Sequence, residues 1–213
     1  MGSIGPSHRE QTPGEERWNV GTHFAGAVLI IIGGLILLFK KDMTALQVWG
    51  VWVYTMGTFS LFVASTIYHW VKRPRRKRYW RIIDHIAIYY IIAGTYTPVI
   101  LNHLWPDGEY LLWLVWSIAA VGTVLKLYFT GRFKVLSSGL YLAMGYLLFL
   151  EYSAIYDALS TTQFRYLLAG GFFYTVGIIF YQLDNRKYFH SVWHFFVLCG
   201  AAAHYGMVYL SYR

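Results

Sequence analysis

Two pairs of residues in this chain have the types and the spacing of a metal site. Ser65 and His69 are four residues apart, and so are His190 and His194. Because an α-helix returns to the same face about every 3.6 residues, each pair points both side chains in one direction. Neutral imidazole is a common zinc ligand, and three protein ligands with a fourth position left for water are typical of catalytic zinc. The spacing therefore indicates that three imidazoles and a hydroxyl can converge on one ion.

The composition indicates that the helices carrying these pairs lie in a membrane. The chain is 57% hydrophobic and only 13% charged, which is too apolar for an ordinary soluble domain of 213 residues. Its net charge of +8 would suggest a nucleic-acid partner in a soluble protein. Here the positive residues lie in short segments between apolar runs, where they act as topology signals, so no nucleic-acid partner is expected. Cys199 is the only cysteine, which excludes an intrachain disulfide and a cysteine-rich zinc site.

Apolar runs long enough to cross a bilayer, about 20 residues each, predict an all-α membrane protein built as a seven-helix bundle. The polar segment 1–18 is expected to be a tail, and 19–213 to be the transmembrane domain. The seven helices are expected near 22–39, 47–71, 82–101, 110–129, 136–153, 164–182 and 190–210.

Lysine and arginine are distributed unevenly between the two sides of this bundle. With the N-terminus inside, fourteen of them lie on the inner side and four (Lys40, Lys41, Arg165 and Arg213) on the outer side. The positive-inside rule then predicts a cytoplasmic N-terminus, an external C-terminus and a place in the bacterial cytoplasmic membrane. The run from Lys72 to Arg81 can also contact anionic lipid headgroups, although an orienting role is the favoured interpretation.

This orientation brings polar side chains from four helices to one depth near the cytoplasmic face. Ionisable residues at membrane depth usually face a cavity or a partner, which favours a functional site over histidines that merely snorkel or cap helix ends. The residues expected at this depth are Asn19, His23, Ser65, His69, Asp84, His85, His190 and His194.

Several motifs, taken in order, resemble the hemolysin III family, the bacterial branch of the progestin and adiponectin receptor group, which is itself similar to the alkaline ceramidases. The resemblance covers the chain from about residue 15. It implies a seven-helix membrane protein whose zinc is held by His69, His190 and His194 near the cytoplasmic face, with Ser65 and Asp84 beside the metal. The motifs are Glu16-x2-Asn19-x2-Thr22-His23, Ser65-x3-His69, Asp84-His85, Gly94-Thr95-Tyr96-Thr97-Pro98 and His190-x3-His194.

These groups together predict hydrolysis of an amide or ester bond in a membrane lipid. Zinc lowers the pKa of bound water and polarises a carbonyl oxygen. Asp84 is the expected general base and then acid, and Ser65 the expected donor to a developing oxyanion or to the water. The structural alternatives are helix packing for Ser65, and pairing with Arg81 or the helix N-terminus for Asp84.

Four further polar residues are expected to support the metal ligands as hydrogen-bond partners: Glu16, Asn19, His23 and His85. His85 is the weakest of these, because adjacent helical positions point about 100° apart and Asp84 is expected to face the metal. Two other functions stay open at this point. One is a receptor or sensor in which zinc is structural and a lipid is the ligand. The other is a channel or cytolysin, which the clustering of polar groups at one depth disfavours.

Overall fold

The computed structural model describes residues 9–212, which form a bundle of helices without a strand in that range. The prediction of an all-α fold is therefore confirmed. Within residues 9–212, six segments are long and apolar enough to cross a membrane: α1, α2, α4, the segment from α5 to α6, α7 and α8. The helices are α1 Pro13–Leu38, α2 Ala45–Trp70, α3 Pro74–His103, α4 Glu109–Phe129, α5 Lys134–Tyr146, a 3-10 helix Leu147–Glu151, α6 Tyr152–Ala158, α7 Thr161–Gln182 and α8 Phe189–Ser211.

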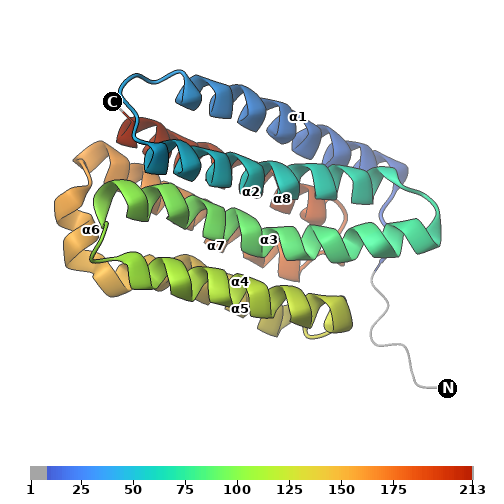
Figure 1. The fold of residues 1–213 in the computed structure, drawn as a ribbon. Helices are drawn as coiled ribbons and strands as arrows, with labels where there is room; N and C mark the ends of the chain where they lie inside the picture. Colours follow the sequence, from blue (N-terminus) through green and yellow to red (C-terminus); the bar gives the residue numbers. More distant parts are fainter. Residues whose placement is uncertain (1–8, 213) are drawn as a thin grey trace.

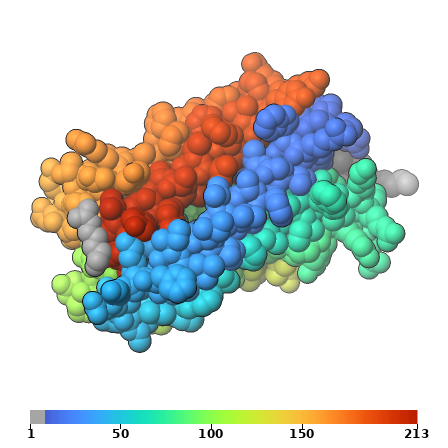
Figure 2. All heavy atoms as spheres, turned by 90° about the horizontal axis from the view of Figure 1, so that it is seen from above, coloured from blue at the N-terminus to red at the C-terminus, as the bar shows by residue number. Residues whose placement is uncertain are grey.

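The long helices run up and down the bundle, so that α1 begins at one end and α8 finishes at the other (Figure 1). On one face α1 lies between α2 and α8 (Figure 2). Helix α3 packs most extensively against α2 and also contacts α4, α5 and α8. The starts of α1, α3 and α8 and the finish of α2 meet at one end, which we call the histidine end.

Helix α3 corresponds to the span expected near 82–101 and is the one expected span that is not among these six segments. It is the least apolar of the long helices. Its second half is almost entirely buried by neighbouring helices, so it needs no apolar stripe facing outward. Hydroxyls are tolerated there because they bond to the helix itself: Thr95 donates to the carbonyl of Ile91 at 2.7 Å and Thr97 to that of Ala93 at 2.9 Å. Whether α3 crosses the membrane stays a prediction.

Large apolar side chains cover the outward faces of the other helices. Leu29 and Ile32 of α1 and Trp113 and Val121 of α4 are each at least half exposed. Such extensive apolar surface is unusual for a soluble monomer and suits contact with lipid.

Two helices begin earlier than expected, because prolines and capping residues extend them beyond their apolar runs. Helix α1 begins at Pro13 rather than near 22, where Thr12 and Glu15 form a reciprocal capping box and the proline occupies the first turn. Residues expected in a tail therefore form the first turns of α1. Helix α3 begins at Pro74 rather than near 82, again with proline in the first turn.

The span expected at 136–153 corresponds to the apolar segment Lys134–Ala158, but the α-helix within it changes to a 3-10 helix at Leu147–Glu151. The hydroxyl of Tyr96 on α3 donates to the carbonyls of Met144 and Gly145 and accepts from the amide of Leu148 at 2.8 Å. A side chain that satisfies backbone groups in this way replaces helical hydrogen bonds and lets the helix change its pitch.

A close approach between α2 and α3 predicts a stability effect at Gly57. A Cβ atom at this position would lie 2.6 Å from the carbonyl oxygen of Tyr90, a backbone atom that cannot rotate away. Gly57→Ala is expected to lower stability by about 1–3 kcal/mol, since it forces the two helices apart. Thermal unfolding of the detergent-purified protein measures this. The control is Gly139→Ala, where nothing lies within 4 Å. Equal melting temperatures for the two variants would contradict the packing argument.

Candidate metal centre

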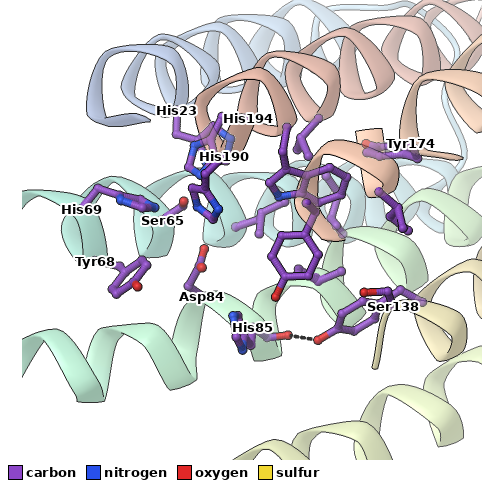
Figure 3. A pocket seen from close by; sticks show the side chains of 18 of the residues that line it. His23, Ser65, Tyr68, His69, Asp84, His85, Ser138, Tyr174, His190 and His194 are labelled. Carbon is purple, nitrogen blue, oxygen red and sulfur yellow. Dashed lines mark hydrogen bonds between the residues drawn. The ribbon is translucent and has the colours of Figure 1, made fainter. Parts of the chain in front are cut away.

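Three histidines from two helices converge at the histidine end. His69 lies in the last turn of α2, and His190 and His194 lie in the first two turns of α8. Each offers a ring nitrogen, and these nitrogens all lie within 4.8 Å of one another. His69 and His194 are buried and His190 is partly buried, and the three rings face a common point (Figure 3). The arrangement is compatible with one bound metal ion, as the two i, i+4 pairs suggested.

The hydrogen bonds of His69 fit a metal ligand. Its Nδ1 lies 2.6 Å from Glu16 Oε2 and 3.3 Å from Asn19 Nδ2. Its Nε2 is buried and has no hydrogen-bond partner among residues 9–212. A carboxylate that accepts from one ring N–H leaves the lone pair on the other nitrogen, which is the usual state of a metal-binding histidine. Buried polar atoms without partners are rare, so a coordinated ion gives this nitrogen a physical reason to be unpaired.

Among the described residues, the two histidines of α8 also have an unpaired ring nitrogen, in their case Nδ1. Nδ1 of His190 and Nδ1 of His194 are also buried without a hydrogen-bond partner in the described part of the chain. The ring centroids of these two residues are 4.8 Å apart, and His69 lies 4.8 Å from His194 and 5.2 Å from His190. Three neutral imidazoles at this spacing are a donor set that suits zinc, and the residues present therefore fit a zinc ion.

Glu16 connects the metal centre to α3. One of its oxygens contacts His69, and the other lies 2.7 Å from Lys77 Nζ. Asn19, one turn further along α1, is fully buried and also bonds to Gln11. The structure thus brings both residues against Nδ1 of the same ligand: Glu16 accepts its N–H, and the Asn19 side chain packs beside it.

The contact between Glu16 and His69 predicts a loss of metal affinity on substitution. Glu16→Gln removes the negative charge that orients and polarises the imidazole, and such changes commonly lower metal affinity about 10–100-fold. Competition with a chelator of known affinity measures the effect. Glu10→Gln is the matched control, because Glu10 also lines the cavity described below, but its side chain makes no hydrogen bond within residues 9–212. Unchanged affinity in Glu16→Gln would show that this contact does not support the metal.

Ser65 and Asp84 approach the histidines from α2 and α3. Ser65 lies one turn before His69 and is buried, and its hydroxyl points toward the carboxyl group of Asp84 (Figure 3). The Asp84 carboxyl group in turn points toward the space below His190 (Figure 3). Both residues line the same cavity as the three histidines. A carboxyl group and a hydroxyl thus share one cavity with the candidate metal ligands.

His23 and His85 lie differently from the other candidates. The His23 ring stacks on that of His194, with centroids 3.8 Å apart, and meets Phe62 edge-on at 5.2 Å. It therefore covers a ligand ring by packing. The His85 side chain lies on the far side of Asp84 from the three histidines (Figure 3), and its carbonyl accepts from Tyr141 at 2.9 Å. The rotation expected between adjacent helical positions accounts for this.

Glu15 was not among the expected site residues, yet it ties the start of α1 to the residue just before α8, the helix that carries two of the candidate ligands. It is fully buried, and its carboxylate accepts from the amide of Thr12 at 2.8 Å and from that of Tyr188, just before α8, at 2.6 Å. It also pairs with Arg9, and this hydrogen bond raises the pKa of the guanidinium above its usual value. The Thr12-x2-Glu15 capping pattern is the sequence signal that could have revealed it.

A cavity of about 1440 Å³ extends from the metal centre into the bundle. Near the histidines its wall carries Ser65, Asp84 and charged residues, and deeper it is lined mainly by aliphatic and aromatic side chains. His204 and Met207, more than two turns beyond His194 on α8, line its far part. The cavity is large enough for an elongated apolar molecule.

Comparisons with known proteins cover the whole metal centre. A family model described as "Haemolysin-III related" matches residues 12–205. The chain is similar to Hemolysin-3 of Bacillus cereus, with 39% identity over 88% of this chain and 87% of that protein. It is also 40% identical to the Hemolysin-3 homolog of Bacillus subtilis (strain 168), over 89% of this chain and 90% of that protein. The human Monocyte to macrophage differentiation factor is 31% identical over 90% of this chain and 82% of that protein. These matches and the six apolar helices indicate an integral membrane protein.

Proposed function

The chain belongs to the haemolysin III-related family, and we propose that it is a zinc-dependent hydrolase of an amide or ester bond in a membrane lipid. The observation that carries this proposal is the convergence of three histidines, a carboxyl group and a hydroxyl at the head of an apolar cavity. Zinc bound by His69, His190 and His194 would supply Lewis-acid activation of water and of the scissile carbonyl.

Asp84 is the proton carrier in this proposal. It lines the cavity from α3, whereas the three histidines line it from α2 and α8. A water molecule held between these helices can therefore pass a proton to Asp84. The same group then returns the proton to the leaving amine or alcohol. Asp84 is partly buried in the cavity wall, where a water molecule beside it is partly shielded from bulk solvent.

Ser65 is the hydrogen-bond donor. Its hydroxyl points into the same space as the Asp84 carboxyl group (Figure 3), where it can stabilise negative charge on the carbonyl oxygen or orient the water. A covalent serine mechanism fits less well, because no histidine hydrogen bond to Ser65 is present in the described part of the chain.

The substrate is a lipid because the cavity wall beyond Asp84 is apolar and the outer faces of the bundle suit a bilayer. The proposal includes seven spans with α3 among them, a cytoplasmic N-terminus and a place in the bacterial cytoplasmic membrane. The metal centre then lies at the depth of the inner leaflet, where the polar linkage of a membrane lipid can reach it. The proposal also includes a role in membrane homeostasis, as the family resemblance suggests.

Incubation of the purified protein with a membrane lipid extract tests the proposal. Mass spectrometry should detect free fatty acid that accumulates with time and with protein concentration. Ser65→Ala should lower the rate about 100-fold, the usual loss for one oxyanion donor. Heat-inactivated protein is the control for spontaneous hydrolysis. A rate no higher than that of the inactivated sample would exclude hydrolysis of the lipids in the extract.

A further inference from the structure

We infer that the lipid bound in this cavity carries an anionic headgroup, which is held by basic side chains around the cavity mouth. The inference rests on the proposed function for the place of the scissile bond at Asp84. We call these side chains the basic mouth, and they are Arg17 of α1, Lys72 and Arg73 between α2 and α3, and Arg76 and Arg81 of α3.

Helix α3 lines the cavity with three successive zones. Arg73, just before the helix, and Arg76 and Arg81 come first, Asp84 follows, and Ile88, Ile92 and Val99 lie deeper. At 1.5 Å per residue, Arg81 lies about 4.5 Å and Arg76 about 12 Å from Asp84 along the helix axis, and Val99 lies about 22 Å beyond Asp84. An amphiphile with its linkage at Asp84 would therefore place its headgroup among the arginines and an acyl chain along the aliphatic zone. The distance from Asp84 to Val99 is longer than the hydrocarbon thickness of one leaflet, which is about 15 Å.

The acidic residues at the mouth do not balance this charge. Glu16 is engaged by His69 and Lys77, and Asp184 pairs with Lys134 at 2.7 Å. Glu10 is the remaining acid on the wall besides Asp84. Arg17, Lys72, Arg73 and Arg76 are exposed to the mouth. An anionic phosphate or carboxylate there gains charge-assisted hydrogen bonds that a neutral headgroup does not make.

Membrane orientation alone does not explain where these arginines lie. Arg75 and Arg78 belong to the same first turns of α3 and are exposed, but they do not line the cavity. The pair Arg75 and Arg78 and the cavity-lining pair Arg73 and Arg76 satisfy the positive-inside rule equally well. The two pairs therefore separate a cavity ligand from a general attraction to the membrane surface.

The test compares two lipids that differ only in the presence of an anionic phosphate headgroup. Phosphatidic acid and diacylglycerol with the same acyl chains are titrated into wild-type protein in bilayer discs of phosphatidylcholine. Wild type should bind phosphatidic acid at least about tenfold more tightly. Arg73→Gln/Arg76→Gln should lose most of this preference, and Arg75→Gln/Arg78→Gln, with the same net charge, should keep it. Inorganic phosphate should not compete at equal concentration, because it lacks the acyl chain.

Two outcomes would overturn the inference. One is equal binding of the two lipids by wild type, and the other is an equal loss of preference in both double variants. A third variant, Leu142→Trp, fills the cavity wall on α5 and should weaken both lipids, which locates binding inside the bundle. Binding is measured without turnover. Selective binding without hydrolysis would refute only the proposed reaction, and hydrolysis without headgroup preference would refute only this inference.

Discussion

Replacing His190 and His194 together with alanine is expected to reduce bound zinc from about one ion per chain to background, because two of three protein ligands are lost. The remaining ligand, His69, cannot hold the ion alone, although Glu16 still orients its ring. Elemental analysis of the purified protein, expressed as moles of zinc per mole of chain, measures the change.

The matched control for this experiment is His204→Ala. His204 lies on the same helix and lines the same cavity, but it is ten residues, or about 15 Å, beyond His194 and cannot share the ion. Its zinc content should equal that of wild type. Circular dichroism of each variant reports whether the helices are retained. A double histidine variant that keeps full zinc occupancy would remove the metal centre as described.

The second large effect is expected at Asp84. Asp84→Asn keeps the shape of the side chain but cannot accept a proton, and the loss of a general base or acid commonly slows a reaction by about 10²–10⁴-fold. The zinc content should not change, since Asp84 is not one of the three metal ligands. Fatty acid release and zinc content are measured on the same preparation.

Asp107→Asn serves as the control, because Asp107 is exposed in the turn before α4, at the other end of the bundle. It should hydrolyse lipid at the wild-type rate. Equal fatty acid release by wild type and Asp84→Asn would exclude the hydrolase. The sensor hypothesis, in which zinc holds the helices together and a lipid shifts the bundle, would then be the better account.

Much of the metal centre could be predicted from the sequence, because its geometry is local. The i, i+4 spacing fixes the relative direction of His190 and His194 within one helix, and the positive residues indicate which helix ends meet. The spacing and the charge distribution together indicated that His69 could join them, and the family resemblance implied the set of three histidines. Glu16 and Asn19 were expected near the metal, although the helix that carries them was expected to begin later.

The remaining features depend on contacts between distant parts of the chain. The change of helix type at Leu147–Glu151 follows from the hydroxyl of Tyr96, 52 residues before Leu148, and no local sequence pattern predicts it. The stacking of His23 on His194 depends on how α1 packs against α8. Glu15 accepts a hydrogen bond from Tyr188, 173 positions further along the chain, so only its capping bond to Thr12 could be inferred from the local sequence.

The most direct test of the proposed hydrolase is metal-dependent lipid hydrolysis by the wild-type protein. Fatty acid release from a membrane lipid extract is followed for the purified protein, for the protein after chelation, and after zinc is restored. We predict release that is lost with the metal and recovered with zinc. Release that is unaffected by removal of the metal, or a rate no higher than that of His190→Ala/His194→Ala, would contradict a zinc-dependent hydrolase.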